Sequence, residues 1–104
     1  MTRAEIIEAA RPHLIANVTL YETSAGGRQN PVSAGWGCPC TVSKAEPITG
    51  WDAFPQLGGN PMKPGERRRL GLVFLTEDGA RAIRDAGKFY LWEGKFIGEA
   101  SVVE

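Results

Sequence analysis

Glycine and proline divide the chain into short β-rich segments, and this spacing constrains its fold more than any other feature. Its 104 residues include 13 glycines and 7 prolines. Glycine adopts the positive φ angles that tight turns need, and proline cannot donate to the hydrogen bonds of a central strand. Several short strands separated by such turns predict a closed barrel or a sandwich rather than a parallel α/β sheet.

Period-two alternation identifies the strands. Ala16, Val18 and Leu20 share one face of residues 14–21, which predicts a strand with one buried side. Residues 69–75 carry apolar side chains on both faces, so we expect both faces to be buried. Further strands are expected at residues 38–44, where Cys38, Cys40 and Val42 share a face, and at 89–92 and 96–103, which a tight turn at 93–95 joins into a hairpin.

Two short helices are also expected. Thr2 and Glu5 have the spacing of a capping box, and the helix that they start should end before Pro12, with Ile6 and Ile7 in its apolar stripe. The second helix should run from an N-cap at residue 76 to a closing glycine at residue 87.

Between the predicted strands at 38–44 and 69–75 lies a segment rich in proline and glycine. Residues 47–64 contain four of the seven prolines together with Trp51 and Phe54. The segment is too apolar for a linker and too often interrupted for regular structure. We expect an ordered loop that folds over one end of the barrel and carries Trp51 as an exposed side chain or as a plug.

The length and the charge balance limit the classes of protein to consider. A chain of this size forms one core, so we expect a helical extension at residues 1–13 and a single β-barrel domain at 14–104. Twelve Lys and Arg balance twelve Asp and Glu, so a nucleic acid or a membrane surface would have to be held by a local patch.

The N-terminal residues and the cysteines bear on the compartment. The chain shows no secretory signal pattern, and no apolar run approaches the roughly 20 residues needed to span a bilayer. Cys38 and Cys40 are only two residues apart, so a disulfide between them would be strained, and we expect reduced thiols. A cytoplasmic protein without membrane contact is expected.

Three separated stretches, taken together, resemble the third, C-terminal β-barrel domain of translation elongation factor Tu. They are Ala16–Tyr21 with Gly26-Gly27-Arg28, Asn30-Pro31-Val32 and Gly35-Trp36; Met62-Lys63-Pro64-Gly65-Glu66 with the strand after it; and Gly87–Gly94 with Ile97-Gly98 and Val102-Val103. The resemblance implies a small closed antiparallel β-barrel. The helix before residue 14 would be a short N-terminal addition, and the helix after residue 75 would be a short insertion. No phosphate loop of the kind Gly-x-x-x-x-Gly-Lys-Ser/Thr occurs, so no GTPase activity is expected.

The preferred functional hypothesis is a non-catalytic module that binds a protein partner. Its surface would be formed by residues 26–37 and by the loop that carries Trp51 and Phe54, because tryptophan and arginine dominate binding hot spots. Trp36 and Arg28 lie in the first of these segments. No cofactor is expected, and the partner and the oligomeric state stay open.

An RNA-binding accessory of translation is the second hypothesis. The resemblance implies that Glu93 matches a family glutamate that approaches the tRNA backbone and that Arg28 matches the arginine of the family's Gly-Gly-Arg turn; both would be used in this role. Arg67 and Arg69, which lie in the densest basic run, would add phosphate contacts.

A thiol- or metal-dependent enzyme is the third hypothesis. It would use Cys38, Cys40 and the single histidine, His13. Tetrahedral zinc normally takes four ligands, so buried inert thiols are the preferred interpretation, with no metal and no catalytic residue.

Overall fold

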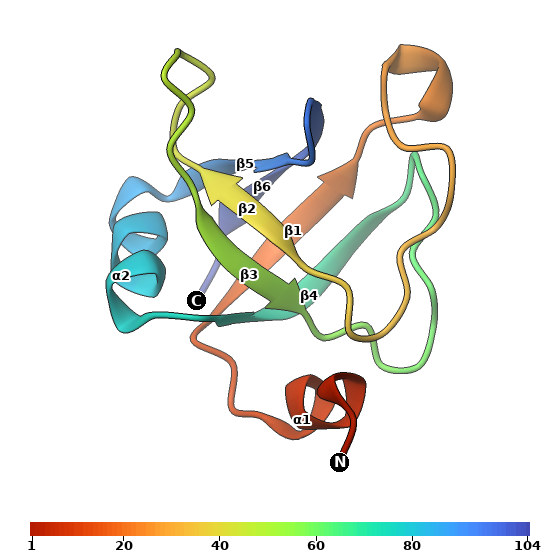
Figure 1. Ribbon diagram of the computed structural model, residues 1–104, viewed down its shortest axis with the longest axis vertical. Coiled ribbons are helices and arrows are strands. Elements are labelled where there is room, and N and C mark those ends of the chain that lie inside the picture. The colour runs from red at the N-terminus through yellow and green to blue at the C-terminus, as the bar shows by residue number, and fades with distance from the viewer.

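The computed structural model describes residues 1–104 and forms a closed barrel of six antiparallel strands with two helices outside it (Figure 1). Around the barrel the strands follow the order β1-β4-β3-β2-β5-β6, and β6 pairs with β1 to close it. The elements are α1 (Arg3–Ala9), β1 (Leu14–Leu20), the 3-10 turn η1 (Thr23–Ala25), β2 (Cys38–Thr41), β3 (Trp51–Pro55), β4 (Arg67–Phe74), α2 (Glu77–Ala86), β5 (Lys88–Trp92) and β6 (Phe96–Val102). The prediction of a mostly β fold with a short N-terminal helix and an inserted helix is confirmed.

The alternation of β1 explains how the barrel fills its interior. Leu14, Ala16, Val18 and Leu20 are buried, and the residues between them are half-buried. In the register of β1, Val18 faces Arg68 of β4 on one side and Ala100 of β6 on the other. Inward side chains of the other strands complete one core that includes Leu72, Phe74, Phe89, Leu91 and Ile97.

Both helices begin as their sequences predict. The Thr2 hydroxyl accepts from the Glu5 N–H at 3.2 Å, and the Glu5 carboxylate accepts from the Thr2 N–H at 2.9 Å. Thr76 caps α2 by accepting from the Gly79 N–H at 3.0 Å. The prediction for the apolar stripe of α1 is half right, because Ile7 is buried whereas Ile6 is 53% exposed. In this helix of seven residues, Ile7 is the one buried side chain.

Three details of the strands differ from the predictions. Residues 51–55 form β3, so the expected irregular loop contains a strand that pairs with β2 and β4. β2 ends at Thr41, and Val42 is 43% exposed instead of sharing the buried face of Cys38 and Cys40. On the outer face of β4, Val73 is only half-buried, and Leu75, which follows the strand, is 66% exposed, so this face is not buried as the core face is.

α2 packs against one side of the barrel and approaches β3 closely at Gly79. Gly79 lies so close to β3 that a Cβ atom there would stand 2.7 Å from the Cβ of Trp51. Ala80 and Ile83, on the same side of the helix, are buried in the core. Neither helix of the chain has the length and apolar character that crossing a membrane requires.

Candidate functional site

The interior of the barrel is filled by side chains. The cavity at its centre measures about 10 Å³ and is lined almost entirely by apolar residues, among them Val18, Leu72 and Leu91. This volume approximates one water-sized sphere, so a small molecule has no room inside the barrel. Any binding site therefore lies on the outer surface.

Three residues that are distant in sequence meet at one end of the barrel and form the Arg28–Trp36–Glu93 cluster. Arg28 follows η1, Trp36 precedes β2, and Glu93 lies in the turn between β5 and β6. The Trp36 indole N–H donates to Glu93 Oε2 at 3.0 Å, and Arg28 Nη1 donates to the same oxygen at 3.2 Å. The Arg28 guanidinium also lies over the Trp36 ring, 5.4 Å from its centroid.

The members of this cluster restrain one another through direct contacts. The Arg28 side chain is only 19% exposed, and the Glu93 side chain is 41% exposed. The buried Nε of Arg28 makes no hydrogen bond, so one donor of this guanidinium group is unused. A cation that is stacked on an indole and paired with a carboxylate has few alternative rotamers, which reduces the entropy lost on binding.

An open depression lies beside the cluster, between the start of α1 and residues 31–36. Its volume is about 510 Å³, and Arg3, Arg28 and Trp36 contribute its larger side chains. Pro31, Ser33 and Ala34 are exposed along its wall. Sequence reasoning missed Arg3 and the part of α1 that borders the depression, although the capping box at Thr2 already fixed where the helix begins.

The two aromatic residues expected in a binding loop belong to β3 instead. Trp51 is half-buried and packs against Gly79 of α2, so it is not a free aromatic side chain at a loop tip. Phe54 is also half-buried, and the Arg3 guanidinium lies 5.7 Å from its ring centroid. Phe54 thus adjoins the depression through Arg3, whereas Trp51 supports the helix.

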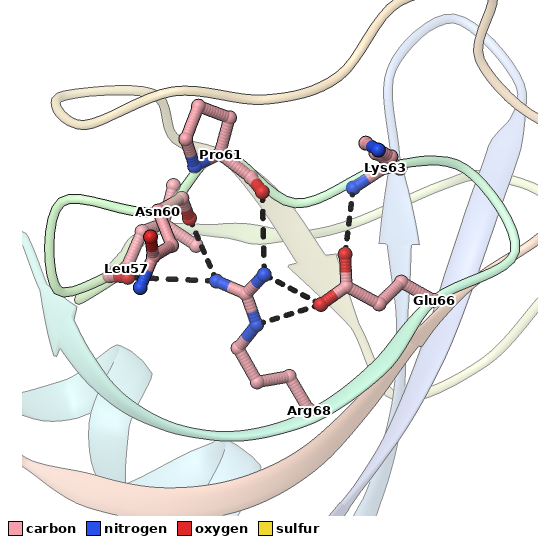
Figure 2. A network of polar contacts seen from close by, with 6 residues as sticks. All are labelled: Leu57, Asn60, Pro61, Lys63, Glu66 and Arg68. Carbon is pink, nitrogen blue, oxygen red and sulfur yellow. Dashed lines mark hydrogen bonds and ion pairs between the residues drawn. The ribbon is translucent and has the colours of Figure 1, made fainter.

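The basic run 67–69 is divided among different roles. Arg68 points toward the 57–63 segment, where its Nη atoms donate to the carbonyls of Asn60 at 2.7 Å and Pro61 at 3.2 Å, and its Nε donates to Glu66 at 2.9 Å (Figure 2). Arg69 forms an exposed ion pair with Glu104 at 2.6 Å. Arg67 lines a separate small hollow together with Asn17 and Thr19 of β1. The three arginines therefore do not form one continuous basic stripe.

The thiols and the histidine have different surroundings. Cys38 and Cys40 are both buried and unbridged. The hydrogen bond between the two cysteines, together with burial, raises the pKa of the Cys40 thiol well above its usual value, which favours the unreactive protonated form. His13 Nδ1 accepts from the Phe74 N–H at 3.0 Å, and its Nε2 lies 3.5 Å from Glu77.

No group of three or more His, Cys, Asp or Glu side chains is arranged to hold a metal ion. Zinc sites in proteins need at least three such ligands.

Comparison with known proteins assigns no family to this barrel. No protein-family model matches the chain, and no curated protein is significantly similar to it.

Proposed function

We propose that the chain is a non-catalytic module that binds a protein partner through the Arg28–Trp36–Glu93 cluster and the adjoining depression. The single observation that carries the proposal is the combination of this preformed cluster with an open hollow of about 510 Å³ beside it. Arginine and tryptophan are the residue types that most often dominate protein interfaces. The filled interior of the barrel leaves the outer surface as the place for recognition.

The closure of the barrel favours recognition by side chains. Every strand is hydrogen-bonded on both edges, so a partner has no free edge to which it could add a strand. A peptide or loop lying in the depression would instead contact Arg3, Trp36 and the small residues of 31–35. Arg3 lines the depression, and no acidic side chain does, so a partner segment that presents acidic side chains or backbone carbonyls is favoured.

The proposal includes the finer assignment to a barrel of the kind found in the third domain of elongation factor Tu. The Gly-Gly-Arg turn, the Pro-Gly turn and the closing hairpin support this assignment, and the closed antiparallel architecture is compatible with it. RNA binding receives less support, because Glu93 is already bonded to Arg28 and Trp36 and Arg69 is paired with Glu104. Of the arginines in that hypothesis, Arg67 alone has no acidic partner.

Affinity capture from a host lysate tests the proposal. The tagged wild type is compared with Ala34→Arg, which adds a large side chain to the exposed wall of the depression. Ala86→Arg places the same side chain on exposed α2 and serves as the matched control. We expect a defined protein, recovered with and without ribonuclease, to be retained by the wild type and by Ala86→Arg and lost with Ala34→Arg.

Two results would contradict the proposal. Equal capture by Ala34→Arg and the wild type would remove the depression from the binding surface. Recovery of RNA, with all bound proteins disappearing after ribonuclease treatment, would replace the protein-binding function with the RNA-binding one.

A further inference from the structure

Three aromatic side chains from different segments of the barrel surround one ammonium group. Tyr21 follows β1, Tyr90 lies on β5, and Phe96 begins β6. Lys44 Nζ lies 5.5 Å from the Tyr21 ring centroid, 4.9 Å from that of Tyr90 and 5.3 Å from that of Phe96. We call the three rings the aromatic cage.

The cage has fixed walls. The Tyr90 and Phe96 rings stand nearly perpendicular, with an interplanar angle of 77° and 6.1 Å between their centroids. The Tyr21 hydroxyl donates to Glu99 Oε1 at 3.0 Å, which orients the third ring and places a carboxylate beside the cage. All three aromatic residues are half-buried. The faces of these rings carry the negative side of the ring quadrupole, and rings of fixed orientation can bind a cation without rearranging.

Lys44 fills the cage with little help from hydrogen bonds. Its ammonium donates one long hydrogen bond, 3.4 Å, to the Tyr21 hydroxyl, and it forms no ion pair with a carboxylate. The contacts that the cage offers to this group are therefore mainly those between a charge and aromatic faces. A cation that carries methyl groups instead of N–H donors would keep these contacts and would lose fewer hydrogen bonds to water.

The segment that brings Lys44 to the cage is weakly attached. Lys44 lies in the loop between β2 and β3, which projects beyond the barrel in Figure 1 (yellow-green). None of the backbone–backbone hydrogen bonds outside the helices and strands involves residues 42–50. Residues 42–46 are all exposed. Moving Lys44 out of the cage would therefore disrupt few other contacts.

We propose that the aromatic cage is a binding site for a quaternary ammonium group and that Lys44 occupies it as a built-in competitor. Choline-like small molecules and the trimethylated lysine of a protein both present this group. The ligand would replace the Lys44 ammonium between the same three rings, beside the Glu99 carboxylate. The cage shares no residue with the Arg28–Trp36–Glu93 cluster, so this proposal can fail while the proposed function stands, and the reverse is also true.

Lys44→Ala provides the main test, because it vacates the cage without changing a ring. Choline and a short glycine-flanked trimethyl-lysine peptide are titrated into the ¹⁵N-labelled protein, and amide shifts around residues 21, 90 and 96 are followed by NMR. If Lys44 occupies the cage nine-tenths of the time, its removal strengthens the apparent affinity about tenfold. Lys63→Ala is the matched control, because Lys63 is an exposed loop lysine whose side chain makes no polar contact. It should bind as the wild type does.

An uncharged ligand and a variant that lacks one aromatic ring distinguish cation binding from simple apolar contact. The uncharged carbon analogue of choline, 3,3-dimethylbutan-1-ol, should bind at least about tenfold more weakly than choline to Lys44→Ala, because only the cation interacts with the ring quadrupoles. Tyr90→Leu in the Lys44→Ala background keeps an apolar side chain and removes one aromatic face. Choline affinity should fall about tenfold in this variant, whose fold is verified from the same spectra.

The two sources of the ligand give different results. Comparable binding of choline and the peptide would support a site for small quaternary amines, whereas binding of the peptide alone would support a site for a methylated protein segment. Absence of binding of either ligand to correctly folded Lys44→Ala would overturn the proposal. Equal affinity for choline and its neutral analogue would overturn it as well.

Discussion

At the scale of the residue, Arg68 illustrates how an apparently free cation is used to order a loop. Its side chain lies on the inward-facing register of β4, between the exposed Arg67 and Arg69, and is 23% exposed. It reaches the carbonyls of Leu57, Asn60 and Pro61 as well as the Glu66 carboxylate. The planar guanidinium can satisfy several acceptors at once, which a lysine ammonium cannot do in the same geometry.

Replacing Arg68 with alanine should lower the free energy of unfolding by about 2 kcal/mol, because several carbonyl groups lose a charged donor. Arg68→Lys should recover less than half of this loss. Urea unfolding followed by tryptophan fluorescence measures both effects. Arg69→Ala is the control and should cost at most about 1 kcal/mol, since its ion pair with Glu104 is exposed. Equal costs for the two alanine variants would show that Arg68 does not organise the loop.

At the scale of the element, α2 depends on the absence of a side chain at residue 79. Gly79 is the third residue of α2, and glycine within a helix lowers stability by up to about 1 kcal/mol relative to alanine. Here a Cβ would also stand 2.9 Å from Cγ and 3.0 Å from Cδ1 of Trp51. These distances are shorter than carbon atoms tolerate, so the close approach of helix and strand favours glycine.

Gly79→Ala should therefore destabilise the protein despite its better helix propensity. Overpacking typically costs about 1–3 kcal/mol, which exceeds the propensity gain of about 1 kcal/mol. Urea unfolding should show a free energy of unfolding that is lower than that of the wild type by on the order of 1 kcal/mol. Arg81→Ala, on the exposed face of α2, changes propensity little and should leave the midpoint near that of the wild type. A more stable Gly79→Ala variant would mean that α2 packs more loosely on β3.

The elements also show which parts of the structure can be predicted from sequence. β1 is evident because its apolar residues alternate without interruption, and both helices are evident from their caps. β3 is not evident from sequence, because residues 51–55 lie among prolines and glycines. They form a strand by pairing with β2 at Cys38 and with β4 at Phe74, which are distant in sequence. The cluster residues were identified individually, but Glu93 meets Trp36 across 57 positions and Arg28 across 65. Only the closed barrel brings them together.

At the scale of the whole molecule, one half-buried phenol, that of Tyr21, links stability to alkaline pH. Burial, followed by the hydrogen bond to Glu99, raises the pKa of Tyr21 to about 12 from 10.0. The folded protein therefore holds this proton more tightly than the unfolded chain. The resulting stabilisation is fully present below pH 10 and is lost as the pH rises toward 12.

Tyr21→Phe should remove this dependence. Urea unfolding of the wild type and the variant at several pH values between 9 and 12 should give a difference in stability that shrinks as the pH rises, because only the wild type loses the Tyr21 contribution. Glu99→Gln removes the negative charge, so the pKa of Tyr21 should fall toward 10, as ultraviolet titration of the phenol measures. A stability difference that does not change with pH would contradict the linkage.

The pairing of β1 with both β4 and β6 has a consequence for how the protein is made. During synthesis β1 emerges from the ribosome before the other strands, yet its two neighbours in the barrel are the fourth and the sixth strands in chain order. The apolar face of β1 therefore leaves the ribosome long before the strands that cover it. During this interval the nascent chain exposes a surface to which chaperones bind or through which chains aggregate. The yield of the folded protein in a cell should thus depend on how fast the later part of its message is translated.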